Sequence, residues 1–377
     1  YLIGRSIPLY GIDTSAYKNS VLSVENILMQ AIGGDQNRSS LFALGVSPHI
    51  ISSIGLQIIL AFLGKDVQKQ FSAKRKNAIS SKVMLIIALV QAVSNLRHLN
   101  FACTGVELYI SYMVAVIEMV TGTFVILWLA GRNKKYGIGG QTLFILINIM
   151  DGIRLVLSQH ELEKLILPGM ISLIVIVIIV FMDNLEIHIP VQRISIYNIY
   201  ADQNYIAFKF IPIGVMPVMY ASALFTVPTM IVSVLEMLFP KSGQIAWFAT
   251  ELSLKRPFGI AVYLVGMLFL TLFFSIIFIN PNELAEQLLK VGDSVVGLGS
   301  GKSTSRYFKR VLVCLSLLSA LVLGICLGIP MVLSMKGLVE DSLAMLPSSI
   351  MMLTGIFGSL YQEALTIRSY DNYRPFI

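Results

Sequence analysis

Residues 165–182 read LILPGMISLIVIVIIVFM and carry no charged side chain. A helix needs about 20 mostly apolar residues to cross the hydrocarbon layer of a bilayer, so this stretch predicts a membrane-spanning helix. The same reasoning predicts eight more spans, near 41–63, 83–102, 107–130, 140–158, 212–235, 258–279, 311–330 and 343–366. The chain is therefore expected to cross a membrane many times.

The composition of the whole chain also indicates a membrane protein. Of its 377 residues, 56 % are hydrophobic and only 13 % are charged, whereas a soluble domain has about 25 % charged residues. Polar surface is too scarce to cover a globule of this size, which excludes a soluble enzyme, a disordered protein and a nucleic-acid-binding module. The 3 cysteines and 4 histidines show no metal-ligand spacing, so we expect neither a metal nor another cofactor.

Lysine and arginine are distributed unevenly over the connections between the expected spans. The connections 64–82, 131–139, 183–211 and 280–310, together with the C-terminal tail, hold 18 of the 28 basic residues. Basic connections stay on the cytoplasmic side of a membrane, so we expect these segments and both termini to face the cytoplasm. Because the chain opens Tyr1-Leu2-Ile3, we expect a first helix that lies mostly upstream of it. No connection is long enough for a soluble catalytic domain, so we expect no enzyme.

Two features leave alternatives open on the residues alone. Residues 20–37 are too short and too polar to cross a membrane and break at Gly33-Gly34. They fit a re-entrant half-helix buried in protein or a surface loop lying on the membrane interface. Glu118 lies inside an apolar run, where a carboxylate is a functional candidate by default. Glu118 fits the coupling residue of a proton-coupled carrier. It also fits a helix-packing contact, since no second charged residue accompanies it at that depth of the membrane.

Residues 297–304 read GLGSGKST and resemble a phosphate-binding loop. That motif needs four residues between its first glycine and the Gly-Lys-Ser/Thr, and here only three are present. We expect no buried strand before it either. The segment is therefore interpreted as a flexible basic loop.

Several ordered blocks of the sequence resemble one family. Gly33-Gly34 and the stretch 39–50 (SSLFALGVSPHI) resemble the plug and second helix of SecY, the protein-conducting channel. Further blocks agree in order along nearly the whole chain: IPLYG at 7–11, VTGT at 120–123 with Trp128-Leu129, KYGIG at 135–139, GVMPVMYAS at 214–222, and NPNELAE at 280–286 with Arg310-Val311-Leu312.

The resemblance implies an all-α multi-spanning membrane protein, a ten-helix bundle whose two inverted halves clamp an hourglass pore. We expect the halves at 1–182 and 183–377, with the first helix largely missing from this chain. The plug would lie at about 20–37 and include Val24, Ile27, Leu28, Ile32, Gly33 and Gly34. Carried over by motif, the ring that seals the pore would comprise Val46, Ile50, Thr142, Leu146, Met216, Met219 and Ser349.

A lateral gate is implied between the second and seventh helices. Gln57 and Gln91 are the candidate gate residues, with their amides expected to hydrogen-bond across the closed gate. Each such bond contributes about 0.5–1.5 kcal/mol, which a binding event can overcome. Thr142 and Ser349 make the ring more polar than the isoleucines usual in the family, so the seal would be weaker or the plug would contribute more of it.

Two departures from the family concern the loops that meet the cytosolic motor. The family's eighth-to-ninth loop usually carries Gly-x-Arg-Pro-Gly, and its arginine is replaced here by Gly299. The connection 183–211 has only Arg193 and Lys209 as basic residues. The chain is similar in this respect to the accessory SecY of Gram-positive bacteria, which has its own motor. The residues expected to face that motor are Arg193, Lys209, Gly299, Lys302 and Arg306.

The resemblance implies a passive channel subunit of an accessory Sec translocase in the plasma membrane of a bacterium. It would pass unfolded secretory proteins, among them serine-rich glycosylated adhesins, with energy from an accessory SecA-type ATPase motor. The expected partners are the motor, the secretory preprotein, small accessory membrane subunits and the lipid bilayer, with no nucleic acid. The alternatives are a housekeeping SecY channel or a proton-coupled secondary transporter.

Overall fold

The computed structural model describes residues 1–12, 34, 39–63, 73–96, 99–102, 105–193, 204–239, 243–299 and 301–373. Within these residues, eight helices or helical segments are long and apolar enough to cross a membrane, and α3 (Ser47–Phe62) is a shorter apolar helix. The long helices are α5 (Ala73–Leu96), α6 (Val106–Tyr136), α7 (Thr142–Gln159), α8 (Leu162–Asn184), α9 (Met216–Leu238), α11 (Pro257–Ile279), α13 (Lys302–Met335) and α15 (Leu346–Tyr373). Each expected span corresponds to one of these nine helices.

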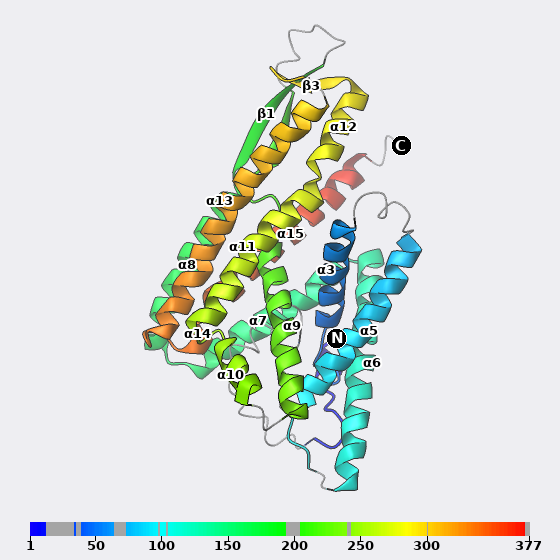
Figure 1. Ribbon diagram of the computed structural model, residues 1–377, viewed down its shortest axis with the longest axis vertical. Helices are drawn as coiled ribbons and strands as arrows, with labels where there is room; N and C mark the ends of the chain where they lie inside the picture. The colour runs from blue at the N-terminus through cyan, green and yellow to red at the C-terminus, as the bar shows by residue number, and fades with distance from the viewer. Residues whose placement is uncertain are drawn as a thin grey trace.

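The helices form two groups that meet along the middle of the molecule (Figure 1). In one group α5 packs between α3 and α6, and in the other α11 packs against α13 while α15 packs against α8 and α7. The two groups touch where α3 and α5 meet α9. A large cluster of buried residues from α3, α7, α9, α11 and α15 fills the centre. The outward faces remain apolar, as at Ile166 and Phe181 of α8, which suits contact with lipid.

An irregular segment, 39–46, precedes α3 and lies inside the bundle. All of its residues except the half-buried Leu41 are buried. Its backbone groups are bonded locally or to the segment 7–9: Leu9 N–H donates to the Ser39 carbonyl at 2.8 Å and Leu41 N–H to the Ile7 carbonyl at 3.0 Å. Gly45 adopts φ +56°, a conformation that favours glycine. The sequence predicted a helix from residue 41, whereas α3 begins six residues later, at Ser47.

Buried hydroxyls inside the spans bond to backbone carbonyls one turn earlier. Ser222 and Thr226 of α9 donate to the Val218 and Ser222 carbonyls at 2.9 and 2.7 Å. Thr271 and Ser275 of α11 follow the same pattern, at 2.7 Å each. Such bonds satisfy polar groups without water in the hydrocarbon layer.

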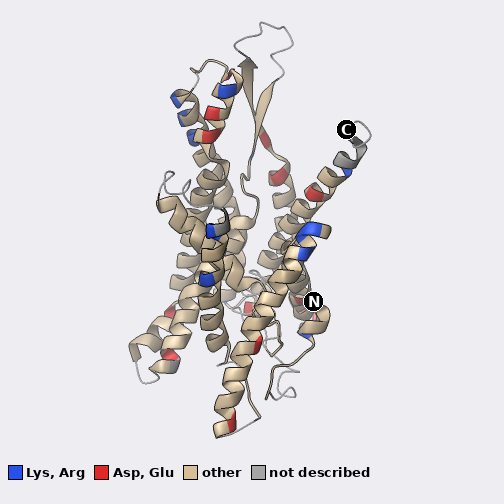
Figure 2. Ribbon diagram, turned by 90° about the vertical axis from the view of Figure 1, so that its right-hand side faces the viewer, with Lys and Arg blue, Asp and Glu red and all other residues tan. Residues whose placement is uncertain are grey.

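One end of the bundle carries a small antiparallel sheet, which the all-α expectation missed. Strand β1 (Glu186–Arg193) pairs with β2 (Tyr205–Lys209) and with β3 (Asp293–Val295), in the order β2-β1-β3. A cluster beneath it includes Ile189, Phe208 and Phe308. The amphipathic helix α12 (Pro281–Val291) packs beside α13 at this end. Many lysines and arginines gather here and at the start of α5 (Figure 2).

The opposite end is held by polar contacts between connections. The His160 Nε2 atom lies 2.9 Å from a Glu340 carboxylate oxygen, and Lys164 Nζ lies 2.6 Å from the other. The Lys164 hydrogen bond keeps the pKa of Glu340 below its ordinary value. Lys255 pairs with Asp341 of α14 (Asp341–Ala344) at 2.6 Å. The contacts of Glu340 tie the junction of α7 and α8 to the connection that leads into α15. Lys255 ties the connection before α11 to the same place, and the short helix α10 (Gly243–Glu251) packs on α9.

A close backbone approach predicts the cost of adding one methyl group. A Cβ at Gly122 of α6 would lie 2.1 Å from the Leu41 carbonyl oxygen, whereas a Cβ at Gly131 of the same helix meets nothing within 4 Å. Gly122→Ala should therefore lower the free energy of unfolding by about 1–3 kcal/mol, the usual cost of overpacking. Thermal unfolding of the purified protein measures this, with Gly131→Ala as the matched control. Equal melting temperatures for the two variants would show that the segment 39–46 is not packed as described.

Candidate pore and side cleft

A cavity of about 1030 Å³ opens at the centre of the bundle, between the two helix groups, and is called here the central cavity. Its wall comes from α3, the start of α7, the end of α8, the approach to α9, and α15. Polar groups line part of it, among them Gln57, Gln141 and Gln362. Lys209 Nζ lies 3.6 Å from the Asp183 carboxylate on the same wall. A wide, partly polar cavity of this kind suits a passage better than a site for one tightly fitted ligand.

The expected ring residues fall into two sets. Ile50, Thr142, Met216 and Met219 line the central cavity. Val46, Leu146 and Ser349 are buried and do not line it. Val46, Ile50, Leu146 and Met219 all belong to the large buried cluster that fills the centre of the bundle. Ser349 of α15 donates its hydroxyl to the Met345 carbonyl at 3.2 Å.

Of the expected plug residues, only Gly34 lies within the described part of the chain. It is buried, and its carbonyl oxygen accepts a hydrogen bond of 3.1 Å from the side-chain amide of Asn148. Val24, Ile27, Leu28, Ile32 and Gly33 lie outside the described residues. Gly34 is thus placed against α7 in the interior of the bundle.

Two polar residues of α7 escaped the sequence analysis. Asn148 accepts a hydrogen bond from the Tyr1 hydroxyl at 2.6 Å while it donates to Gly34. Asp151 forms an ion pair with Arg5 of α1 (Leu2–Arg5). Their spacing of three residues places them on one helix face, and a polar stripe inside the expected span 140–158 was the signal available. Together they fasten the N-terminal segment to α7.

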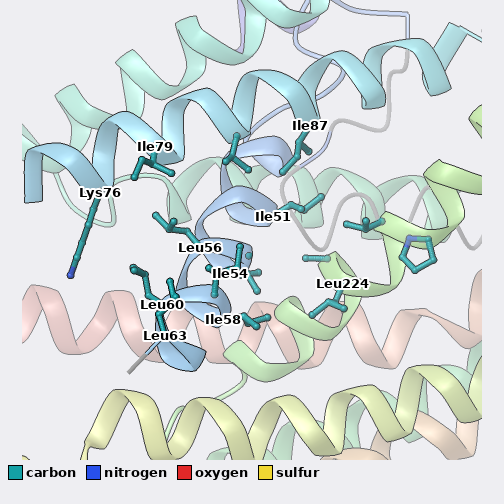
Figure 3. Close-up of a pocket in the computed structure, with 16 residues that line it drawn as sticks. Ile51, Ile54, Leu56, Ile58, Leu60, Leu63, Lys76, Ile79, Ile87 and Leu224 are labelled. Carbon is teal, nitrogen blue, oxygen red and sulfur yellow. The ribbon is translucent and has the colours of Figure 1, made fainter. Parts of the chain in front are cut away.

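A second cavity, of about 570 Å³, lies between α3, α5 and α9 and is called here the side cleft. Figure 3 shows aliphatic side chains of these helices pointing toward one another, with Lys76 at one end. Pro228, inside α9, also lines it. The cleft follows the boundary where the helix group of α3 and α5 meets α9.

The two expected gate amides do not bridge this boundary. Gln91 of α5 accepts a hydrogen bond of 2.9 Å from the Ser47 hydroxyl of α3. That bond joins two helices on the same side of the side cleft, so the expectation of a bond from Gln91 across the gate is wrong in this structure. Gln57 lines the central cavity instead, and its buried Oε1 atom has no hydrogen-bond partner among the described residues.

The two connections expected to face a motor are brought together by the sheet. Arg193 at the end of β1 stands in register with Asp293 of β3. Lys302 and Arg306 lie in the first turns of α13, just after β3. The strand β3 corrects the expectation that no strand precedes the glycine-rich loop. The Ser303 and Thr304 hydroxyls both donate to the Gly299 carbonyl, at 2.7 and 3.0 Å, so both bond to the loop that precedes α13.

Glu118 has a structural partner. Its carboxylate oxygen Oε2 accepts a hydrogen bond of 3.0 Å from the Tyr10 backbone N–H. The carboxylate thereby joins α6 to the segment that follows α1. This contact fits the packing interpretation of Glu118.

The long apolar helices of the described residues define a multi-spanning membrane protein. Comparison with known proteins gives the family: the sequence profile of SecY matches residues 40–361. The chain belongs to the SecY family, whose members are channels and transport proteins of the membrane. With eight long apolar helices among its described residues, it is a multi-pass protein of the bacterial plasma membrane.

The similar relatives cover the whole chain. The accessory Sec system protein translocase subunit SecY2 of Streptococcus agalactiae (serotype Ia strain A909) is 26 % identical over 99 % of this chain and 92 % of its own length. The SecY2 of Streptococcus sanguinis is 25 % identical over 100 % of this chain and 95 % of its own. The sequence thus resembles accessory SecY proteins from end to end.

Solved structures agree on the fold. The structure of a protein conducting channel superposes with a TM-score of 0.71 at 19 % identity, covering 97 % of this chain and 89 % of that one. Sec61 in the canine ribosome-channel complex from the endoplasmic reticulum gives a TM-score of 0.66 at 18 % identity, with the same coverage.

Proposed function

We propose that this chain is the central channel subunit of an accessory Sec translocase, which passes unfolded secretory proteins across the plasma membrane. The observation that carries the proposal is the central cavity, about 1030 Å³ in volume, whose wall includes Ile50 and Met219. These two residues belong to the buried apolar cluster that also holds Val46 and Leu146. Apolar constrictions close a pore by dewetting, and flexible methionine side chains adapt to varied neighbours. Such a ring would seal around a passing chain of any sequence.

The lateral gate is proposed at the boundary between α3 and α9. The two helix groups there are joined through the aliphatic walls of the side cleft, whereas Gln91 holds α5 to α3. Parting at this boundary would therefore move α3 and α5 together. We propose residues 1–182 and 183–377 as the two halves of the clamp, joined where α8 and α7 of the first half pack on α15 of the second.

The sheet end is proposed as the docking surface of a SecA-type ATPase, with the basic connections and both termini on the cytoplasmic side. Arg193, Lys209, Gly299, Lys302 and Arg306 belong to the segments that meet there. The proposed substrates are serine-rich glycosylated adhesins, in keeping with the similarity to accessory SecY2 proteins. Small accessory membrane subunits and the lipid bilayer complete the proposed partners.

Crosslinking tests the pore assignment. In a background without Cys103, Cys314 and Cys326, a stalled preprotein should crosslink to Ile50→Cys and Met219→Cys only when the motor and ATP are present, because both side chains contact the proposed path. Ile166→Cys, on the outward face of α8, is the matched control and should stay unlabelled. Labelling that is no stronger at the two ring positions than at Ile166, with export intact, would refute the assignment.

Substitution of Glu118 separates a channel from a proton-coupled carrier. Glu118→Gln cannot carry a proton, but its amide oxygen can still accept the Tyr10 N–H bond. Export driven by the motor should therefore stay within about twofold of the parent, since the hydrogen bond contributes only about 0.5–1.5 kcal/mol. Export by reconstituted vesicles measures this over a range of pH. Loss of flux together with loss of its pH dependence would favour the carrier.

Charge reversal tests the docking surface. The double variant Lys302→Glu and Arg306→Glu should reduce stimulation of the motor's ATPase by channel-containing vesicles about tenfold or more, because like charges at an interface weaken association strongly. Lys336→Glu, beyond the far end of α13, is the control and should leave stimulation unchanged. Equal effects of the two charge reversals would place the motor elsewhere.

A further inference from the structure

The side cleft is an almost purely aliphatic groove with one cation at its end. Of the 16 residues that line it, only Lys76 has a polar side chain. The others come from α3, α5 and α9, as Leu60, Ile79 and Leu224 illustrate in Figure 3. Among the described residues, Lys76 forms no ion pair with a carboxylate. The groove therefore joins a long apolar wall to a positive charge that no carboxylate of the described residues offsets.

The length of the groove matches one leaflet of a bilayer. Its α3 wall runs from Ile51 to Leu63, which at the rise of an α-helix is about 18 Å. The hydrocarbon core of a bilayer is about 30 Å thick, so the wall covers slightly more than half of it. Lys76 lies near Leu60 and Leu63 in Figure 3. Its charge therefore sits where the headgroup of a lipid would be if the acyl chain followed the wall inward.

The charge of Lys76 favours a lipid with an anionic headgroup over a signal sequence as the occupant of the groove. The segment that precedes the apolar core of a signal peptide is itself positive, so Lys76 would repel it at this end of the groove. A phosphate has the complementary charge. The volume of about 570 Å³ lies within the range of roughly 300–1,000 Å³ that holds small ligands.

We propose that the side cleft of the resting protein is a binding site for an anionic glycerophospholipid, with an acyl chain along α3, α5 and α9 and its phosphate at Lys76. The lipid fills the boundary between the two helix groups and must leave before they part there. That consequence rests on the proposed function, whereas occupancy of the resting cleft does not.

Photolabelling in vesicles tests the site without any transport. The probes are phosphatidylglycerol and phosphatidylcholine with a diazirine near the end of one acyl chain, and labelled peptides are mapped by mass spectrometry. Phosphatidylglycerol should label α3, α5 and α9 at the side cleft more strongly than phosphatidylcholine does. Lys76→Glu should reduce the phosphatidylglycerol labelling about fivefold or more, since one basic residue at an anionic surface contributes about 1 kcal/mol.

Two further variants separate binding in the cleft from general contact with lipid. Gly55 lines the side cleft and has open space around it, as does Gly169 on the outward face of α8. Gly55→Phe should fill the groove and abolish labelling by both probes there, whereas Gly169→Phe should not. Lys82→Glu, an exposed position of α5 outside the lining, is the charge control.

The photolabelling and export results together distinguish failure of the lipid site from failure of the proposed function. If labelling of the side cleft is unchanged by both Lys76→Glu and Gly55→Phe, or is equally strong with the two lipids, the lipid site is refuted whatever the export assay shows. Labelling that follows the predicted order with no motor-dependent export supports the lipid site and counts against the channel. Displacement of phosphatidylcholine and phosphatidylglycerol alike by a synthetic signal peptide, with no effect of Lys76→Glu, would assign the cleft to the peptide instead.

Discussion

Backbone that is not helical can lie at membrane depth only if protein surrounds it, and the segment 39–46 is where this protein meets that constraint. The amides of Leu41, Ala43 and Gly45 donate to the Ile7 carbonyl or to carbonyls of the segment itself. Gly122 gives it room, because α6 approaches the Leu41 carbonyl too closely for any side chain. The segment then turns at Gly45 into α3 and sets Val46 and Ile50 in the interior. The position of the proposed ring thus depends on how this short irregular stretch is buried.

The distribution of contacts shows which parts of the bundle can separate. Polar bonds occur within each helix group: Gln91 with Ser47 in one, and Ser222 with Tyr263, 3.1 Å apart, in the other. The boundary between α3 and α9 is lined instead by aliphatic side chains around the side cleft. Apolar surfaces in a membrane gain little from each other that lipid tails do not also offer. The polar bonds of Tyr1 and Arg5 to α7 join the two groups elsewhere, so the boundary between α3 and α9 is where we propose that they part.

The spans could be predicted because hydrophobicity alone determines where a chain enters a bilayer. Their ends could not, because α5 and α13 continue as helices from the apolar spans into the basic connections. The sheet was missed because β1 and β3 are far apart in the sequence, and three-residue β3 has no periodicity of its own. Gln91 was assigned to the gate from its residue type, whereas its partner follows from the packing of α5 on α3. Asn148 and Asp151 were detectable as a polar stripe within a span.

The polarity of Thr142 and Ser349 raises the question of how the proposed ring could seal. The Ser349 hydroxyl is taken up by the Met345 carbonyl, so it adds little polarity to the pore, and Thr142 stands at the wall of the central cavity rather than in the apolar cluster. The seal would therefore rest on Val46, Ile50, Leu146 and Met219. On α7, Asn148 follows Leu146 by two residues and holds the Gly34 carbonyl. The proposed ring and the expected plug residue Gly34 are thus both in contact with α7, so a movement of α7 would affect the two together.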